Sequence, residues 1–188
     1  EQLVNDCGDV DILVNNAGTI PGGTIEEINE ERWRTAWELK VFGYINMMRE
    51  CYRMMKSRGR GVIVNVIGNA GNQAPAEYAA GVSADAMLEV LTRTLGGDSL
   101  DHGIRVVGVS PGDLLNERGI MFLRRQAEEE LGDPERWSER LAELPGGRAG
   151  ASEEVADAIV FLASPRSNYT SGAILTIDGG VSARRAVM

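Results

Sequence analysis

Four short apolar runs alternate along this chain with three segments of helical length, and this alternation limits the fold more than any other feature. Each run is rich in β-branched residues and has the length of one strand, and each intervening segment is long enough to cross back over a sheet as a helix. Right-handed crossovers of this kind place consecutive strands parallel to one another. The strand-length runs are residues 10–14, 61–67, 104–109 and 173–177, and the helical segments are residues 30–56, about 77–100, and 152–163.

The glycine and aromatic contents agree with this layered arrangement. The chain has 23 glycines and 5% aromatic residues, a balance that favours an α/β fold over an all-helical or all-β fold. Its 188 residues suffice for one substantial core, and no change of composition marks a second domain. We therefore predict a single domain, residues 1–188, in which about four parallel strands are flanked by helices.

Local signals predict the helix ends and an insertion. Ser152 resembles an N-cap, and Gly59 predicts the end of the preceding helix. Between the third run and the last helix, residues 117–132 and 134–144 have the charge pattern of two amphipathic helices. Insertions of this length usually cover a ligand crevice, so residues 116–146 are predicted to form a lid.

Charge and cysteine usage disfavour several classes of partner. The formal net charge is −9 and the basic residues are scattered, which argues against nucleic acid and anionic membrane surfaces. No stretch approaches the roughly 20 apolar residues that span a bilayer. Cys7, Cys51 and His102 provide neither a disulfide framework nor a metal-ligand set, so no metal site is predicted. The predicted location is the reducing cytoplasm.

Small polar residues follow all four strand-length runs. In an open parallel sheet, ligands bind beyond the carboxyl ends of the strands, so these residues are the first candidates for a binding site. Glycine and alanine let a ligand approach the backbone, and amide side chains can tie neighbouring strands together. Agreement at all four ends makes coincidental tight turns a poor explanation. The four ends read Asn15-Asn16-Ala17-Gly18, Gly68-Asn69-Ala70-Gly71, Ser110-Pro111-Gly112 and Asp178-Gly179-Gly180.

Taken in this order, the motifs resemble the classical short-chain dehydrogenase/reductase family over nearly the whole chain. Each motif alone is weak, whereas the ordered set from Asp11 to Gly180 is specific. Further points of resemblance are Trp33 with Gly43 and Asn46, Gly61-Val62-Ile63-Val64-Asn65, Gly103-Ile104-Arg105-Val106, and Glu153-Glu154-Val155-Ala156 before Phe161-Leu162-Ala163-Ser164.

The resemblance implies the C-terminal part of a Rossmann-like, doubly wound α/β fold that binds NAD or NADP. In the family, the first strand, the glycine-rich pyrophosphate loop and the second strand come before the point where this sequence starts. Residues 1–5 look like the last turns of a helix that enters a strand, so we expect a further N-terminal segment in the parent protein. Without the family's first strand beside it, the run at residues 10–14 would expose an apolar edge.

The resemblance also assigns residues to the cofactor. Ala17 and Gly18 would let the backbone approach a flat ligand. Asn116 stands where the family often has a threonine that contacts the carboxamide, and its amide can still donate and accept hydrogen bonds. The residues assigned to the cofactor are Asn16, Ala17, Gly18, Tyr78, Pro111, Gly112, Leu114 and Asn116.

The catalytic set of the family is an asparagine, a serine, a tyrosine and a lysine. The tyrosine is the general acid/base, the lysine lowers its pKa and holds the nicotinamide ribose, the serine polarises the carbonyl, and the asparagine supports a water relay. In this chain the asparagine position falls on Lys40, and the serine position falls on Gly68. Neither family residue is present.

The tyrosine and lysine positions have two possible registers. In the first register the tyrosine is Tyr78, and the lysine position falls on Val82. In the second register, which keeps the helix free of gaps, the two positions fall on Gly81 and Asp85. Tyr78 lies three residues before Gly81, about one turn away and roughly 4.5 Å along the axis.

These departures suggest a rearranged catalytic pair. An ammonium at Lys40 beside the phenol of Tyr78 would stabilise the phenolate and lower its pKa. In the alternative interpretation, the Tyr78 hydroxyl lies in water at a helix start, and Lys40 is a surface lysine whose stem covers Trp37. The sequence leaves both interpretations open.

The sequence therefore predicts an NAD(P)-dependent oxidoreductase that, in the full-length parent, reduces a carbonyl or oxidises a secondary alcohol of a small molecule. A second interpretation is a catalytically silent family member that binds a nucleotide or a partner subunit, and a third is an incomplete chain without activity of its own. The family commonly packs two of its helices, here residues 30–56 and 77–100, against another copy. The resemblance thus also implies a homodimer or homotetramer.

Overall fold

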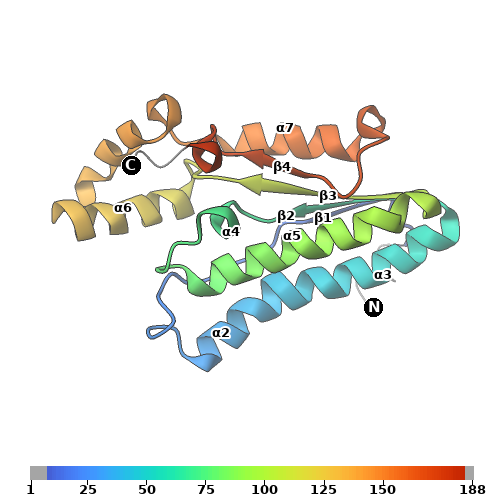
Figure 1. The fold of residues 1–188 in the computed structure, drawn as a ribbon, viewed down its shortest axis with the longest axis horizontal. Helices are drawn as coiled ribbons and strands as arrows, with labels where there is room; N and C mark the ends of the chain where they lie inside the picture. Colours follow the sequence, from blue (N-terminus) through green and yellow to red (C-terminus); the bar gives the residue numbers. More distant parts are fainter. Residues whose placement is uncertain (1–7, 185–188) are drawn as a thin grey trace.

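The computed structural model describes residues 8–184 and confirms the alternation of strands and helices (Figure 1). The strands form one parallel sheet in the order β1-β2-β3-β4. The predicted helix end at residues 1–5 and Cys7 lie outside the described residues. The strands are β1 (Ile12–Asn15), β2 (Gly61–Val66), β3 (Ile104–Pro111) and β4 (Ile174–Ile177).

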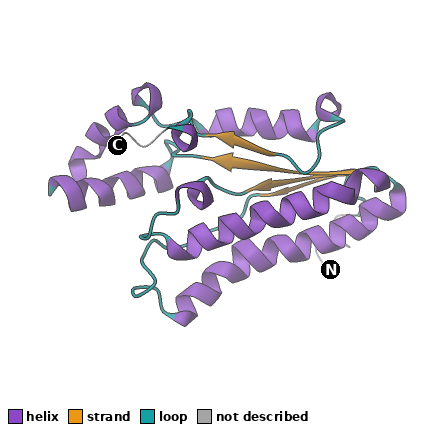
Figure 2. Cartoon of the chain, viewed as in Figure 1, coloured by secondary structure: helices purple, strands orange, loops and turns teal. Residues whose placement is uncertain are grey.

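Helices cover both faces of this sheet, which makes it a doubly wound, Rossmann-like α/β fold as predicted (Figure 2). The α-helices are α2 (Glu30–Trp37), α3 (Gly43–Arg58), α4 (Ala70–Gln73), α5 (Ala79–Ser99), α6 (Glu117–Leu131) and α7 (Ser152–Ala163). A π-helical turn, η1 (Glu38–Phe42), joins α2 to α3. The 3-10 segments are η2 (Leu100–His102), η3 (Pro134–Glu143), η4 (Pro145–Gly147), η5 (Pro165–Ser167) and η6 (Val181–Ala183).

Alternate residues of the central strands point to opposite faces of the sheet, as the period of a strand requires. Ile63 and Val106 pack against α3 and α5, together with Met48 and Met55 from α3. Val64, Val107 and Val109 instead pack beneath α7, against Val155 and Leu162. Both faces of β2 and β3 are therefore buried, which explains why these strands read as continuous apolar runs.

The outer strand β1 is covered on one face only. Leu13 is buried against the α3 side, whereas Ile12 and Val14 keep 49% and 42% of their surface exposed on the other. The predicted exposure of apolar side chains at this edge is therefore confirmed.

The helix predicted at residues 30–56 is interrupted by the π turn η1. A π turn adds one residue to the repeat of the helix and frequently occurs at functional sites. Lys40 lies within this turn. The predicted end of α3 is confirmed, since Gly59 adopts a left-handed conformation with a φ of 67°.

Two predictions about the later helices were wrong. The segment predicted as an amphipathic helix at residues 134–144 is the 3-10 segment η3. Its ion pairs Arg136–Glu139 and Arg140–Glu143 are spaced three residues apart, which matches the three residues per turn of a 3-10 helix.

Ser152 is the first residue of α7 and not its N-cap. The cap is Ala151, whose backbone N–H donates to the carboxylate of Glu154 at 2.8 Å. A carboxylate three residues into the helix therefore satisfies the amide at the cap.

Candidate active site

The carboxyl ends of the four strands meet at one edge of the sheet, next to α4, α6 and the start of α5 (Figure 1). A buried row of polar side chains ties this edge together. The amide of Asn15 donates to Asn65 Oδ1 at 2.8 Å, and the amide of Asn65 donates to Thr92 Oγ1 at 2.9 Å. These bonds fix β1, β2 and α5 relative to one another, so the prediction that amides tie neighbouring strands is confirmed.

The ends of β2, β3 and β4 are held by short contacts. The Ser110 hydroxyl donates to the carbonyl of Gly68 at 2.8 Å, and the Gly112 N–H donates to the carbonyl of Ile177 at 2.9 Å. A Cβ on Gly112 would lie 2.6 Å from the Cβ of Asp178. Glycine at this position therefore allows β3 and β4 to approach closely.

Lys40 forms a buried ion pair on the α5 side of this edge. We call the region around Lys40, Gly68, Tyr78 and Asp85 the crevice. Its Nζ donates to Asp85 Oδ1 at 2.6 Å and to the carbonyl of Ile67 at 2.6 Å. Only 11% of the Lys40 side chain and 3% of the Asp85 side chain are exposed. The alternative of a surface lysine is therefore wrong for Lys40. The Lys40 ammonium also bonds to Asp85 instead of forming the predicted direct pair with Tyr78.

The Asp85 carboxylate also fills the space beside Gly68. A Cβ on Gly68 would lie 2.7 Å from Asp85 Oδ2, and Gly68 has a φ of +139°, where side chains are rarely tolerated. Residues 40, 68 and 85 thus meet in space. These are the positions that carry the asparagine, serine and lysine of the family when the second register is used.

Tyr78 lies at the first turn of α5 with its ring directly over Gly81. A Cβ on Gly81 would overlap the ring of Tyr78, so the ring occupies the space into which residue 81 would project a side chain. The Tyr78 hydroxyl accepts a hydrogen bond from Arg118 Nη2 at 3.1 Å. The alternative interpretation correctly put Tyr78 at a helix start, but the hydroxyl of Tyr78 is bonded to Arg118.

Burial is the main influence on the two acidic groups of the crevice. It raises the pKa of the Tyr78 hydroxyl, while Arg118 lowers that pKa and the charge of Asp85 raises it. Burial also raises the pKa of Asp85, against the opposing effect of Lys40. The crevice is therefore a desolvated region in which each charge depends on its partner.

The residues assigned to the cofactor divide into exposed and packed groups. Asn16, Ala17 and Gly18 are exposed at the end of β1. Leu114 is half-buried and packs with the α7-side cluster. Asn116 is the N-cap of α6, because its side-chain oxygen accepts the N–H of Gly119 at 2.9 Å. The side chains of Leu114 and Asn116 thus have structural partners that the sequence did not reveal.

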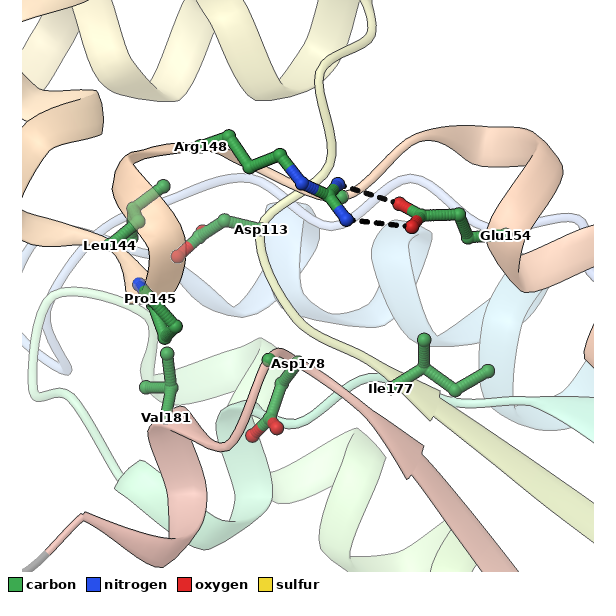
Figure 3. A pocket seen from close by; sticks show the side chains of 10 residues that line it. Asp113, Leu144, Pro145, Arg148, Glu154, Ile177, Asp178 and Val181 are labelled. Atoms are coloured by element: carbon green, nitrogen blue, oxygen red, sulfur yellow. Dashed lines mark hydrogen bonds and ion pairs between the residues drawn. The ribbon is translucent and has the colours of Figure 1, made fainter.

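A cavity of about 160 Å³ lies at the ends of β3 and β4, on the α7 side (Figure 3). Arg148 and Glu154 form a two-pronged ion pair along its wall, with contacts of 2.7 and 2.8 Å. Partial desolvation raises the pKa of the exposed Asp113, which lines the same cavity. Its lining includes neither Lys40 nor Tyr78.

Sequence reasoning missed the contribution of Arg118 and the ion pair of Asp85. Arg118 belongs to a charged insertion without a family motif, and nothing in its spacing distinguishes it from neighbouring arginines. The ion pair did leave a signal. A cation at position 40 coincides with an anion at position 85, a paired change of charge between two family positions.

An open parallel sheet with helices on both faces and polar side chains along its carboxyl edge defines a Rossmann-like α/β protein. The family described as enoyl-(acyl carrier protein) reductase matches residues 1–182. An uncharacterized oxidoreductase of Thermotoga maritima is 39% identical over 185 residues, which cover 97% of this chain and 71% of that protein.

Two further proteins agree with this match. A 3-oxoacyl-(acyl-carrier-protein) reductase of Vibrio cholerae is 32% identical over 182 residues, which cover 95% of this chain and 69% of that protein. The structure of L-sorbose reductase from Gluconobacter frateurii, complexed with NADPH and L-sorbose, matches with a TM-score of 0.85 at 30% identity. That alignment covers 98% of this chain and 71% of the reductase. The chain belongs to the short-chain dehydrogenase/reductase family of oxidoreductases.

Within residues 8–184, no helix combines the length and apolar character needed to cross a bilayer. The same residues contain no cluster of three or more histidine, cysteine, aspartate or glutamate side chains suited to a metal ion.

Proposed function

We propose that the full-length protein is an NAD(P)-dependent oxidoreductase that interconverts a small-molecule carbonyl compound and its secondary alcohol. The observation that carries this proposal is the ring of Tyr78 over Gly81. In the second register the tyrosine position is Gly81, and the phenol ring of Tyr78 fills the space that a side chain at Gly81 would occupy. Family membership and the likeness to the NADPH complex of L-sorbose reductase support the class of cofactor.

Tyr78 is the proposed general acid/base. Bound NAD(P)H would supply the hydride for the carbonyl carbon in reduction and would be left as NAD(P)⁺. Tyr78 gives its hydroxyl proton to the carbonyl oxygen, and the resulting phenolate regains a proton from water. Alcohol oxidation follows the reverse path. A positioned acid of this kind typically contributes about 10²–10⁴-fold to the rate.

The residues at the end of β1 fit one wall of a dinucleotide site. Asn16, Ala17 and Gly18 are exposed and carry small side chains. A Cβ on Gly18 would lie 3.1 Å from the Lys40 stem, so glycine keeps the backbone open beside that lysine. The proposed contacts are the backbone of these three residues, the Pro111-Gly112 loop with Leu114 and Asn116, and Tyr78.

Lys40 is proposed to act on Tyr78 through Asp85. Because the ammonium neutralises the Asp85 carboxylate at 2.6 Å, it reduces the repulsion that this carboxylate exerts on a phenolate at Tyr78. Lys40 is thus a positioning residue in this scheme. It differs from the family's lysine, which contacts the ribose.

Residues 116–146 are proposed as a lid within a single domain. They form α6, η3 and the start of η4, which lie beyond the carboxyl ends of the strands (Figure 2). Composition and cysteine usage support a cytoplasmic location.

A homodimer or homotetramer that packs through α3 and α5 is also proposed. An apolar groove runs between these helices, lined by Ile45, Met48, Arg49, Tyr52, Arg53, Leu91 and Leu95. Val90, on α5, is 61% exposed. Light scattering of the full-length protein should give a multimer that Val90→Lys dissociates and Ile25→Lys, in an exposed loop, does not. A monomeric wild type would reject this arrangement.

A catalytically silent, nucleotide-binding module is the second candidate, and the Lys40–Asp85 ion pair favours it because it occupies the asparagine and lysine positions of the family set in the second register. One experiment separates the two. The full-length protein is mixed with NADH or NADPH, and binding is followed by nicotinamide fluorescence. Turnover is then measured on a panel of ketones, aldehydes and 3-oxoacyl thioesters. Binding with turnover supports the enzyme, whereas binding without turnover on any member supports the silent module.

A further inference from the structure

Arg118 connects the insertion to the candidate acid/base. It lies in the first turn of α6, and its guanidinium reaches back over the loop that follows β1. One terminal nitrogen donates to the carbonyl of Gly18 at 3.3 Å, and the other donates to the carbonyl of Ile20 at 3.2 Å and to Tyr78 Oη at 3.1 Å. A single side chain thus bonds to the β1 end, the following loop and the start of α5.

Aromatic contacts hold this arginine in the same place. The Arg118 guanidinium carbon lies 5.4 Å from the centre of the Phe122 ring, which is one turn further along α6. The ring of Phe122 meets the Tyr78 ring edge-on at a centroid distance of 6.1 Å. α6 therefore presents a cation and an aromatic ring together to Tyr78, and both depend on where α6 sits.

The direction of the hydrogen bond matters for the chemistry. A guanidinium can only donate, so the Tyr78 oxygen is the acceptor in this contact. The Tyr78 proton is therefore not used in the bond to Arg118, and it can be donated to another oxygen. A charged donor also stabilises the ionised form of the group that accepts from it.

The backbone around Tyr78 is fixed independently of Arg118. The Gly23 N–H donates to the carbonyl of Glu77 at 2.6 Å, and the Ala79 N–H donates to the carbonyl of Gly23 at 3.2 Å. Removal of the guanidinium would thus leave the start of α5 attached to the loop, while the hydroxyl of Tyr78 would lose its charged donor.

We propose that Arg118 is a positioning residue that orients the Tyr78 hydroxyl and stabilises its phenolate when α6 lies against it. This inference rests on the proposed function, in which Tyr78 transfers the proton. It couples the position of the lid to catalysis, because Tyr78 acts as an acid/base only when α6 places Arg118 against its hydroxyl. In this chain, Arg118 supplies to the phenol the positive charge that the family's lysine supplies.

Several charged groups surround Tyr78, and their effects differ in sign. Burial raises the pKa of Tyr78, Arg118 lowers it, and Asp85 raises it. Lys40 neutralises Asp85 through their ion pair, so its influence on Tyr78 is indirect. The charged residues that face this region are Arg118 and Arg125 from α6, Lys40 from η1, Asp85 from α5, and Glu77 beside the tyrosine.

The test is a spectroscopic titration of tyrosinate in the full-length protein. The difference between wild type and Tyr78→Phe isolates the titration of Tyr78. Arg118→Gln should move its midpoint upward by at least about one pH unit, the lower end of the effect of an adjacent opposite charge. Arg118→Lys should keep most of the wild-type midpoint because it retains the charge. Arg124→Gln is the matched control, since Arg124 is on the same helix but pairs with Glu135 at 3.3 Å.

The pH profile of kcat provides the second readout. The limb of the profile that reports Tyr78 ionisation should shift in Arg118→Gln by the same number of pH units as the tyrosinate midpoint. Circular dichroism checks that the variant is folded. A Tyr78 midpoint unchanged by Arg118→Gln would overturn this inference even in an active enzyme. If the wild type lacks turnover, the proposed function fails, while a shifted midpoint would still establish that Arg118 controls the ionisation of Tyr78.

Discussion

The carboxyl edge of the sheet and the crevice beside it are in contact, but they differ in how many of the family's motif residues they retain. At the edge, motif residues are kept and several have structural partners, as in the Asn15–Asn65 bond and the contact between Gly112 and Asp178. In the crevice, the family's asparagine and serine positions hold Lys40 and Gly68. One region preserves the scaffold, and the other has been rebuilt.

The rebuilt positions compensate for one another. Asp85 neutralises Lys40, and the absence of a side chain at Gly68 leaves room for the Asp85 carboxylate. A change at any one of these positions alone would create a buried charge or a steric overlap. The side chains that shape the sheet edge can therefore be retained while those at the catalytic positions differ. Lys40, Gly68 and Asp85 must then differ together.

The largest expected effect on stability comes from the breaking of the buried ion pair. Lys40→Met leaves the Asp85 carboxylate uncompensated at 3% exposure and should cost about 3–5 kcal/mol of unfolding free energy. Lys40→Met combined with Asp85→Leu should recover most of that loss. Arg34→Met is the control, because Arg34 and Glu30 are each 78% exposed and their pair should be worth under about 1 kcal/mol. Urea denaturation measures all three, and a double variant no more stable than Lys40→Met would contradict compensation.

The second prediction concerns Gly68→Ser, which introduces the family's serine while Asp85 remains beside it. Gly68→Ser should destabilise the protein by about 2–4 kcal/mol, the sum of left-handed backbone strain and overlap with Asp85. Gly97→Ser on α5 should be close to neutral, since a Cβ there meets no atom within 4 Å. Equal denaturation midpoints for the two variants would show that position 68 tolerates a side chain.

The third effect tests the edge rather than the crevice. Asn65→Ala removes a buried amide that bonds to both Asn15 and Thr92, and the unpaired groups should cost about 1–3 kcal/mol. Asn46→Ala, at an exposed position of α3, should change stability by less than about 0.5 kcal/mol. Thermal unfolding compares the pair, and a neutral Asn65→Ala would show that the amide row does not hold the edge together.

The smallest effect depends on pH and concerns the start of α7. The hydrogen bonds from Arg148 and from the Ala151 N–H lower the pKa of Glu154 from 4.5 to about 2. A carboxylate with a lowered native pKa stabilises the fold above its unfolded pKa, and this contribution is lost as the pH falls. Glu154→Gln should therefore be slightly less stable at neutral pH, and the difference should disappear between pH 4.5 and about 2. A difference that persists at the acid end would contradict the assignment.

Much of the scaffold was predictable from local pattern, because strand-length apolar runs with glycine-bearing ends specify a parallel sheet by themselves. All four predicted strands are present, and α7 matches its predicted bounds. The π turn at Lys40 and the 3-10 form of η3 were not predictable, since tertiary contacts and ion-pair spacing select them over a regular helix. Lys40 bonds to the carbonyl of Ile67, just past the end of β2, and Tyr78 bonds to Arg118.

Their partners depend on contacts distant in sequence. The Lys40–Asp85 pair spans 45 residues, and the Arg118–Tyr78 contact spans 40. Helical periodicity carries no information over such separations. Only the paired change of charge at the two family positions hinted at the first contact, and nothing in the sequence pointed to the second.

The proposed proton transfer by Tyr78 is tested most directly by the kcat of the full-length Tyr78→Phe variant with saturating cofactor. Tyr169→Phe is the matched control, because Tyr169 is 94% exposed. The account predicts that kcat falls at least about 10²-fold in Tyr78→Phe, with cofactor binding retained and no change in the control. An unchanged kcat in Tyr78→Phe would contradict it.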